Sequence, residues 1–291
     1  MPFFTSIEDT RRRLATTGYL VDEELATAVF LGDALGKPVL LEGPAGTGKT
    51  ELAKAVALAT GAPLVRLQCY EGLDEARALY EWNYRKQLLR IQAANVGEES
   101  GWSDLHDDIF SEEFLLPRPL LSAIRQPVPT ILLVDETDKA DVEVEGLLLE
   151  VLSEFQVTIP ELGTVTAANH PFVVLTSNAT RELSEALKRR CLYAHVDYPD
   201  ATRERAIVLS RVPDISDELA TQLVRAVRAM RAMELRKAPS IAETIDWART
   251  MQVLGVTELT EPVIEQTLGV VLKHHSDREF ASQQLGLRGG S

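Results

Sequence analysis

Cysteine is nearly absent from this sequence: Cys69 and Cys191 are the only two among 291 residues. Neither belongs to a CxxC pair or has a histidine at ligand spacing, which disfavours a disulfide-stapled fold and a zinc site. No apolar run reaches the roughly 20 residues of a membrane-spanning helix. The N-terminal Met1–Phe4 lacks the basic and long apolar stretches of a secretory signal. We therefore expect a cytoplasmic protein with reduced thiols and no transmembrane segment.

Basic residues are also in the minority, because 30 Lys and Arg stand against 44 Asp and Glu, for a net charge of −14. Binding to a nucleic-acid backbone requires a basic surface. The sequence contains no stretch in which basic and aromatic residues are interleaved. A DNA motor or loader is therefore disfavoured, and no nucleic-acid partner is expected.

The chain does contain short apolar runs that alternate with helical patterns. An opening helical segment ends near Gly36, and a second helix is predicted over Glu51–Thr60. The apolar runs predict five strands, at Val39–Leu41, Leu64–Leu67, Ile131–Val134, Phe172–Thr176 and near Leu192–Val196. Strands that alternate with helices predict an α/β domain with a parallel five-stranded sheet. The segment from about 70 to 129 is predicted to be a mostly helical insert.

The pattern changes after Pro199. Ser216 can cap a helix whose apolar face is Leu219, Leu223, Val227 and Met230, and further helices are predicted near Ile241–Leu254 and Pro262–His274. No strand pattern follows. We therefore expect an α/β domain over residues 1–199 and an all-helical domain over 200–291.

One segment fits the phosphate-binding pattern G-x-x-x-x-G-K-[ST], between a predicted strand and a predicted helix. Its residues are Gly43, Pro44, Ala45, Gly46, Thr47, Gly48, Lys49 and Thr50, followed by Glu51. Glycines let backbone N–H groups face phosphates, and the helix that follows presents its positive end to them. Lys49 is expected to reach the β- and γ-phosphates and Thr50 to ligate Mg²⁺. The pattern predicts an ATPase with ATP and Mg²⁺ as cofactors.

Two carboxylates, Asp135 and Glu136, follow the third predicted strand directly. The carboxyl edge of a parallel sheet is where such folds bind ligands. We expect Asp135 to hold Mg²⁺ and Glu136 to polarise the attacking water as a general base. Asp138 and Asp141, close behind, are expected to form a solvated acidic turn.

Two further candidates come later in the chain. Asn178 ends the fourth predicted strand, where a neutral amide can orient water against the γ-phosphate. Arg189 and Arg190 close a helical stretch predicted over Arg181–Arg190. They either cap that helix in solvent or act in trans on a neighbour's γ-phosphate, which requires an oligomer.

This set of motifs resembles the AAA+ ATPases, and within them the MoxR group. The segment Glu150–Gly163 (EVLSEFQVTIPELG) is similar to the sequence around that group's hairpin. The hairpin would span residues 156–167, with one arm at Gln156–Ile159 and the other at Thr164–Ala167. The segment from 70 to 129 resembles its helical insert. Closer likeness to the CoxD-like ATPases of carbon monoxide dehydrogenase maturation runs through LTSNATRELSEALKRRCLYAHVDYP, at Leu175–Pro199. The same likeness to the CoxD-like ATPases is found in two other segments, Leu79–Gln92 (LYEWNYRKQLLRIQ) and Ala238–Ala248 (APSIAETIDWA).

The resemblance implies roles for single residues. Lys49 and Thr50 would belong to Walker A, Asp135 and Glu136 to Walker B, and Asn178 would be sensor 1. Arg190 would be the better arginine finger and Arg189 the second choice. Tyr19, Leu20 and Val21 lie where relatives line the adenine pocket. The sensor 2 arginine is missing, because Ala242 occupies its slot, and Lys237 and Arg249 are the nearby cations.

By resemblance, the protein would form a ring, expected to be a hexamer, and remodel a metalloenzyme precursor together with a von Willebrand A domain protein. Assembly of a Mo/Cu-sulfur centre is the suspected task. Activation of nitric oxide reductase or rubisco is the alternative within the group. An ATP-dependent scaffold with little turnover is the alternative outside it. Tyr70, Trp82 and Tyr84 either contact the client or, for Trp82 and Tyr84, pack inside the insert.

Overall fold

The computed structural model describes residues 2–94 and 108–285, and the chain divides into two compact units. The first unit holds a sheet and the second is mainly helical. The first is made of Met1–Arg13, Asp22–Glu42 and Thr50–His195, and the second of Leu14–Val21, Gly43–Lys49 and Val196–Ser291.

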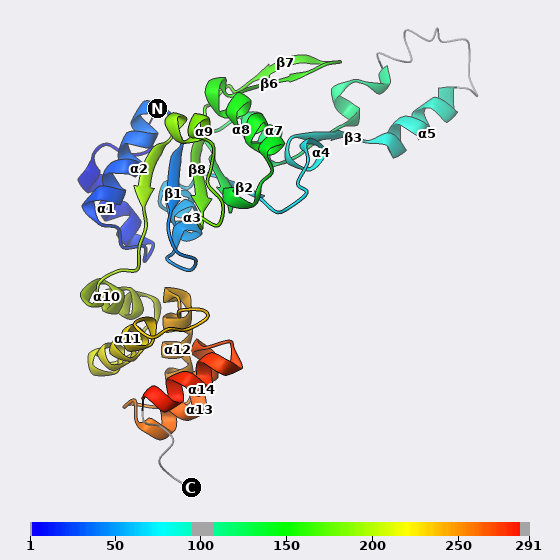
Figure 1. Ribbon diagram of the computed structural model, residues 1–291. Coiled ribbons are helices and arrows are strands. Elements are labelled where there is room, and N and C mark those ends of the chain that lie inside the picture. Colours follow the sequence, from blue (N-terminus) through cyan, green and yellow to red (C-terminus); the bar gives the residue numbers. More distant parts are fainter. Residues whose placement is uncertain (1, 95–107, 286–291) are drawn as a thin grey trace. The chain divides into compact units, whose positions relative to one another are not determined.

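The first unit is built on a parallel five-stranded sheet in the order β2-β5-β8-β1-β9 (Figure 1). Its strands are β1 (Val39–Glu42), β2 (Leu64–Gln68), β5 (Ile131–Asp135), β8 (Phe172–Ser177) and β9 (Leu192–His195). The predicted sheet is therefore confirmed. Strands β5 and β8 are buried along their whole length, as expected when helices cover both faces of a parallel sheet.

Helices of the first unit pack on different strands of this sheet. Helix α2 (Glu23–Leu35) contacts β1, β8 and β9, whereas α7 (Pro119–Ile124) contacts β2 and β5. Helix α2 lies close to β1 because Gly32 has no side chain: a Cβ there would stand 2.5 Å from Val39 Cγ2. Helix α9 (Glu185–Arg190) contacts β9 and also packs on α8 (Val142–Glu154). The remaining helices before the insert are α1 (Ile7–Thr16) and α3 (Lys49–Thr60).

The described part of the insert contains two short strands as well as the predicted helices. Helices α4 (Glu75–Ala78) and α5 (Tyr84–Ala94) flank strand β3 (Tyr80–Trp82), and β3 pairs antiparallel with β4 (Leu115–Pro117), which follows the short helix η1 (Glu112–Phe114). Strands of three residues are too short to leave a periodic signal in the sequence. Figure 1 shows β3 and α5 extending beyond the sheet.

A two-stranded hairpin follows α8. Strands β6 (Gln156–Ile159) and β7 (Gly163–Thr166) are antiparallel, with Val157 opposite Val165. The second arm thus begins and ends one residue before the predicted Thr164–Ala167.

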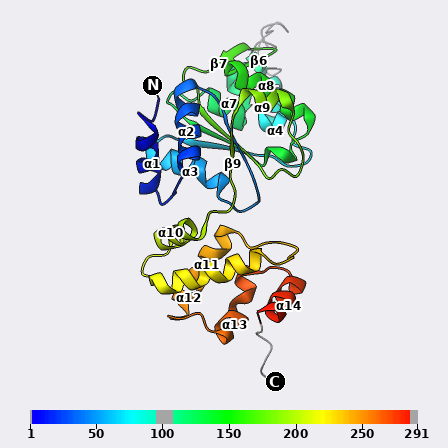
Figure 2. The ribbon, with the colours of Figure 1, turned by 60° about the vertical axis from the view of Figure 1, so that its left-hand side comes forward.

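The second unit contains helices α10 (Ala201–Arg211), α11 (Asp217–Arg231), α12 (Ile241–Val253), α13 (Glu261–Val271) and α14 (His275–Gln284) (Figure 2). The predicted apolar face of α11 is buried, and Ser216 caps this helix by accepting from Leu219 N. Arg231 forms a buried bidentate ion pair with Glu204, at 2.6 and 2.7 Å, which joins α11 to α10. None of the helices within the described ranges is long and apolar enough to cross a membrane.

Candidate functional site

The phosphate-loop sequence forms a tight turn that only glycine allows at its key positions. Gly43, Gly46 and Gly48 have φ values of 156°, 79° and 91°. A Cβ on Gly43 would lie 2.1 Å from Val196 O, and one on Gly46 would lie 2.2 Å from Ser240 Cβ. The loop therefore needs glycine both for its backbone conformation and for the close approach of neighbouring chain.

Lys49 lies at the centre of this loop. Its side chain is 5% exposed, and its ammonium group donates to the carbonyl oxygens of Gly43, at 2.8 Å, and Pro44, at 2.7 Å. A buried ammonium surrounded by oxygen acceptors suits an anionic ligand, whose phosphate oxygens can take over from the carbonyls. The residues present therefore fit the phosphates of ATP.

The other residues predicted to bind nucleotide differ in their contacts. The Tyr19 hydroxyl donates to Gly48 O at 3.0 Å, which places Tyr19 beside the phosphate loop. Leu20 is half-buried, and its carbonyl accepts from Arg203 Nη2 at 2.9 Å. Glu51 lies on α3 and pairs with Lys54 at 2.6 Å.

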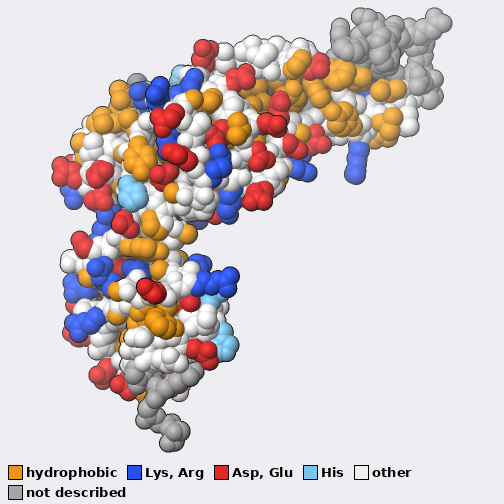
Figure 3. Space-filling view, viewed as in Figure 1, with side chains coloured by type: hydrophobic (Ala, Val, Ile, Leu, Met, Phe, Trp, Pro, Cys, Tyr) orange, Lys and Arg blue, Asp and Glu red, His pale blue; other side chains and the backbone are white. Residues whose placement is uncertain are grey.

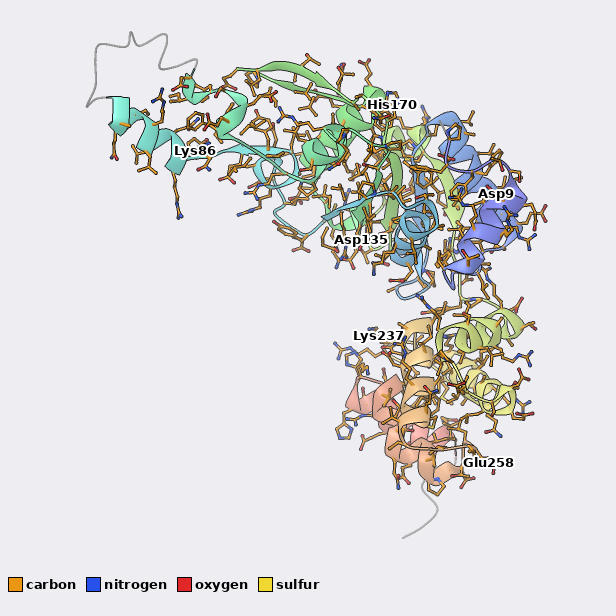
Figure 4. The ribbon with its side chains drawn as sticks, turned by 180° about the vertical axis from the view of Figure 1, so that it is seen from behind. Asp9, Lys86, Asp135, His170, Lys237 and Glu258 are labelled. Carbon is orange, nitrogen blue, oxygen red and sulfur yellow. The ribbon has the colours of Figure 1, made fainter. Side chains whose placement is uncertain are left out.

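Asp135, at the end of β5, gathers donors from three other elements of the first unit. Its Oδ1 accepts from the hydroxyls of Thr50, at 2.8 Å, and Thr176, at 2.6 Å, and its Oδ2 accepts from Arg66 Nη2 at 2.5 Å. The residue is 3% exposed. Asp135, labelled in Figure 4, is the last residue of strand β5. Because its carboxylate accepts from the Thr50 hydroxyl, the two predicted metal ligands lie in direct contact.

This oxygen pair fits Mg²⁺. Magnesium keeps several waters and is bound through one or two carboxylates together with substrate phosphates. It does not need a cluster of three or more His, Cys, Asp or Glu, and residues 2–94 and 108–285 contain no such cluster. Thr50 and Asp135 would hold the ion, which supplies charge neutralisation for the phosphates when bound.

Glu136 follows Asp135 in an unusual backbone conformation, with φ 56° and ψ 49°. Its N–H donates to Thr176 Oγ1 at 2.9 Å, which helps to hold this left-handed geometry. Its Oε2 accepts from Gln68 Nε2 at 3.0 Å and from Lys139 Nζ at 2.6 Å, and the latter bond raises the pKa of Lys139. These two bonds fix the orientation of the Glu136 carboxylate beside Asp135.

Asp138 is not the solvated residue that the sequence predicted. It is 3% exposed, and it accepts from the backbone N–H groups of Asn178 and Thr180, both at 3.1 Å, and from the Thr180 hydroxyl at 2.5 Å. Burial by itself raises the pKa of Asp138, but these hydrogen bonds outweigh it, and the pKa lies below its usual 3.8. Asp138 therefore positions Asn178. Asp141 is exposed, as expected.

Replacing Asp138 with Asn is expected to lower the free energy of unfolding by about 1–3 kcal/mol. Both carboxylate oxygens accept hydrogen bonds, whereas the nitrogen of an amide cannot accept, so at least one donor would lose its partner. The contribution of the carboxylate is present above pH 3.8 and is lost as the pH falls through the lower folded-state pKa. Urea unfolding at pH 7 and at lower pH measures both effects. Asp141→Asn is the matched control, and an equal loss in both variants would contradict this role.

The segment after Asn178 is helical over a shorter range than predicted. Helix α9 begins only at Glu185, because Arg181 and Ser184 are held outside it by the buried Glu145. Arg181 Nη2 donates to Glu145 Oε1 and, at 2.6 Å, to Ala140 O, while Ser184 N donates to Glu145 Oε2 at 3.0 Å.

The two candidate arginines at the end of α9 differ in their contacts. Arg190 Nε donates to Ser153 Oγ at 2.7 Å, so this guanidinium is bound to helix α8 of its own chain. Arg189 is 82% exposed, and its nearest carboxylate oxygen, on Glu185, is 4.0 Å away. Arg189 can reach another molecule directly, whereas Arg190 must first leave Ser153.

Near the sensor 2 slot, Ser240 caps α12 in a capping box with Glu243, and Ala242 is exposed. The Ile241 N–H donates to Gly46 O at 3.2 Å, so the start of α12 contacts the phosphate loop through its backbone. Lys237 lies 4.0 Å from Glu243 and Arg249 lies 3.6 Å from Asp246. The two cations near Ala242 thus face carboxylates.

Several residues of this site carry no motif and were missed from the sequence: Arg66, Gln68, Asp138, Glu145 and Thr176. Arg66 and Gln68 belong to β2, which pairs with β5 so that Gln68 stands opposite Asp135. Polar residues at the end of a strand next to a Walker B strand are the signal that could have identified Gln68 and Thr176.

Comparison with known proteins agrees with this geometry. The family model of the AAA domain (dynein-related subfamily) matches residues 38–191, more than half of the chain. The protein belongs to this family of AAA+ ATPases. It is an ATP hydrolase that uses ATP with Mg²⁺, and family membership suggests assembly into an oligomeric ring.

Similar curated proteins include uncharacterised ones from Staphylococcus haemolyticus, 26% identical over 84% of this chain and 87% of theirs, and from Staphylococcus epidermidis, 26% identical over 83% and 87%. Among solved structures, a mutant of Thermotoga maritima RuvB is 17% identical with a TM-score of 0.50, over 85% of this chain and 67% of that one. This similarity shows a shared fold.

Proposed function

We propose that the protein is a MoxR-type AAA+ ATPase that hydrolyses ATP with the residues named above. The observation that carries ATP hydrolysis is the contact of Thr50 and Thr176 with the buried Asp135, directly beside Glu136. The assignment to the MoxR type rests on the sequence resemblance described above. This arrangement brings a metal-binding carboxylate, a hydroxyl that can ligate the same ion and a general base to one edge of the sheet.

The chain's own residues would act in sequence. Lys49 turns from the carbonyls of Gly43 and Pro44 to the β- and γ-phosphates, and backbone N–H groups of the loop bind the remaining phosphate oxygens. Thr50 and Asp135 hold the metal. Glu136 would take a proton from the attacking water, which Asn178 would orient.

The proposal extends to a ring, expected to be a hexamer, in which an arginine acts between subunits. An arginine presented in trans stabilises the charge that develops on the transferred phosphoryl group. Arg190 occupies the family's position for this residue, and Arg189 is the freer of the two guanidinium groups. Hydrolysis would then break contacts at one interface, so that each turnover biases the arrangement of neighbouring subunits.

The substrate of this remodelling is proposed to be a metalloenzyme precursor in the cytoplasm, with Mo/Cu-sulfur centre assembly as the CoxD-like task and a von Willebrand A domain protein as partner. Tyr70 and Tyr84 are 43% and 65% exposed and can contact a client, whereas Trp82 is 8% exposed and packs against Tyr80 and Phe110. Figure 3 shows hydrophobic side chains along the segment that carries Tyr84. Activation of nitric oxide reductase or rubisco is the alternative within the group.

A second candidate function is an ATP-dependent scaffold that assembles but turns over little. The observation that favours it is Ala242, which offers no cation to the γ-phosphate from the start of α12. Light scattering and phosphate release, measured together with and without a purified von Willebrand A partner, discriminate the two. Assembly without turnover under both conditions would favour the scaffold.

Lys49→Ala is expected to abolish ATP binding, because it removes the buried ammonium at the centre of the phosphate loop. Isothermal titration with ATP and Mg²⁺ measures the loss as at least about a hundredfold in Kd, near 3 kcal/mol. Lys54→Ala, on the exposed side of α3, is the matched control and should keep the wild-type affinity. Unchanged affinity in Lys49→Ala would overturn the site assignment.

A further inference from the structure

Arg66 contacts Asp135 but has no task in the nucleotide chemistry described above. It lies in the middle of β2, and its guanidinium Nη2 donates to Asp135 Oδ2 at 2.5 Å and to Gln68 Oε1. The ion pair is asymmetric, because the Asp135 side chain is 4% exposed and the Arg66 side chain is 47% exposed.

The buried carboxylate of Asp135 needs a nearby positive charge. Two hydroxyls, from Thr50 and Thr176, satisfy Oδ1 but bring no charge. A buried ionised carboxylate without a counter-charge is unfavourable. Arg66 supplies this charge, because its guanidinium forms an ion pair with the other carboxylate oxygen.

Holding both Arg66 and a divalent metal close to this carboxylate is electrostatically unfavourable. Two cations beside one carboxylate repel each other, and their attraction to it is shared. Arg66 is the partner that can leave, because nearly half of its side chain is exposed and an extended guanidinium is readily hydrated. Thr50 does not compete with the metal, because its hydroxyl is neutral and is itself proposed to hold the same ion.

We propose that Arg66 is the counter-ion of Asp135 while no metal is bound, and that Mg²⁺ displaces it. Arg66 is thus a positioning residue, which balances the charge of Asp135 and holds the orientation of its carboxylate between turnovers. Because Mg²⁺ must displace it, Arg66 also sets the midpoint of the magnesium dependence of nucleotide binding. The inference rests on the proposed function, since it takes Asp135 as the metal-binding carboxylate.

The test measures binding of a fluorescent ADP analogue during titration with MgCl₂, starting in EDTA. Arg66→Met keeps the length of the side chain and removes its charge. The midpoint of the magnesium titration is expected to fall by about tenfold, a typical size for a coupling between two binding events. Arg66→Lys, which keeps the charge, is expected to retain a midpoint near that of wild type. Arg77→Met is the matched control, because Arg77 forms an exposed pair with Asp74.

A second readout, thermal unfolding without nucleotide, separates this role from simple structural support. In EDTA, Arg66→Met is expected to unfold at a lower temperature than wild type, and Mg²⁺ is expected to narrow this difference. A variant equally destabilised with and without Mg²⁺, or one with an unchanged magnesium midpoint, would overturn the proposal. Weaker binding of the analogue in EDTA with an unchanged midpoint would do so too, because Arg66 would then contact phosphate.

Failure of the inference is distinguishable from failure of the proposed function. If wild-type protein binds the ADP analogue in a magnesium-dependent way but the Arg66→Met midpoint is unchanged, only the role of Arg66 is lost. If wild-type protein shows no magnesium dependence and Lys49→Ala binds as well as wild type, the proposed site itself is wrong.

Discussion

Glu136→Gln is expected to lower kcat by about 10²- to 10⁴-fold while ATP still binds, because a neutral amide cannot take a proton from the attacking water. The change is nearly isosteric, and the new amide oxygen can still accept from Gln68 as the carboxylate does, so the fold should be unaffected. Phosphate release under saturating ATP measures kcat, and filter binding of labelled ATP measures retention of the nucleotide.

Glu143→Gln is the matched control for this variant, because Glu143 is an exposed carboxylate in the first turn of α8. It is expected to turn over ATP at the wild-type rate. Undiminished turnover in Glu136→Gln would remove Glu136 as the general base. Loss of binding together with turnover would show that the substitution damaged the phosphate loop, and this too would contradict the assigned role.

Arg190→Ala is expected to lower kcat by about 10³-fold or more if this arginine acts between subunits. An equimolar mixture with Lys49→Ala should recover activity, since roughly a quarter of the interfaces in a randomly mixed ring would combine an intact phosphate loop with an intact arginine. Steady-state ATPase rates of the two variants, alone and mixed, measure the recovery.

Arg189→Ala, mixed with Lys49→Ala in the same way, decides between the two arginines. Arg190 occupies the family's position for the finger but is bound to Ser153, whereas Arg189 is exposed. Comparing the two variants therefore shows whether the position in the sequence or the exposure of the side chain decides which arginine acts on a neighbour. The role passes to Arg189 if Arg189→Ala alone is inactive and its mixture with Lys49→Ala regains ATPase activity, while Arg190→Ala alone stays active. If neither mixture exceeds its separate components, no arginine of α9 acts in trans.

The features that the sequence predicted correctly are those with a strong local pattern. The five strands and the buried face of α11 follow from apolar runs and helical spacing. In each case neighbours in the sequence determine the structure. The locations of Lys49 and Asp135 could therefore be expected from the order of residues alone.

The features that it missed depend on residues far apart in the chain. Arg66 and Asp138 have no local signal, because their roles come from β2–β5 pairing and from the loop after β8. Asp138 looks like a turn residue until the N–H groups of Asn178 and Thr180 are brought to it by the fold. The short strands β3 and β4 were missed for the same reason, since each forms only by pairing with the other.

The start of α12 shows how the chain contacts its phosphate loop without a sensor 2 arginine. Gly46 O accepts from Ile241 N–H, and Gly46 has no side chain to keep Ser240 away. Through this backbone hydrogen bond, a movement of the loop would move the start of α12, but the bond brings no charged side chain to the nucleotide. We therefore expect α12 to respond to the conformation of the phosphate loop more than to the charge of the γ-phosphate.

The measurement that tests the central claim most directly is the ATPase rate per chain as a function of protein concentration, with light scattering recorded on the same samples with and without ATP. If each active site is completed by a neighbouring subunit, turnover per chain should rise together with the mass of the assembly and level off when the ring is complete. A rate per chain that is constant across concentrations, in samples whose mass is that of the monomer, would contradict the account.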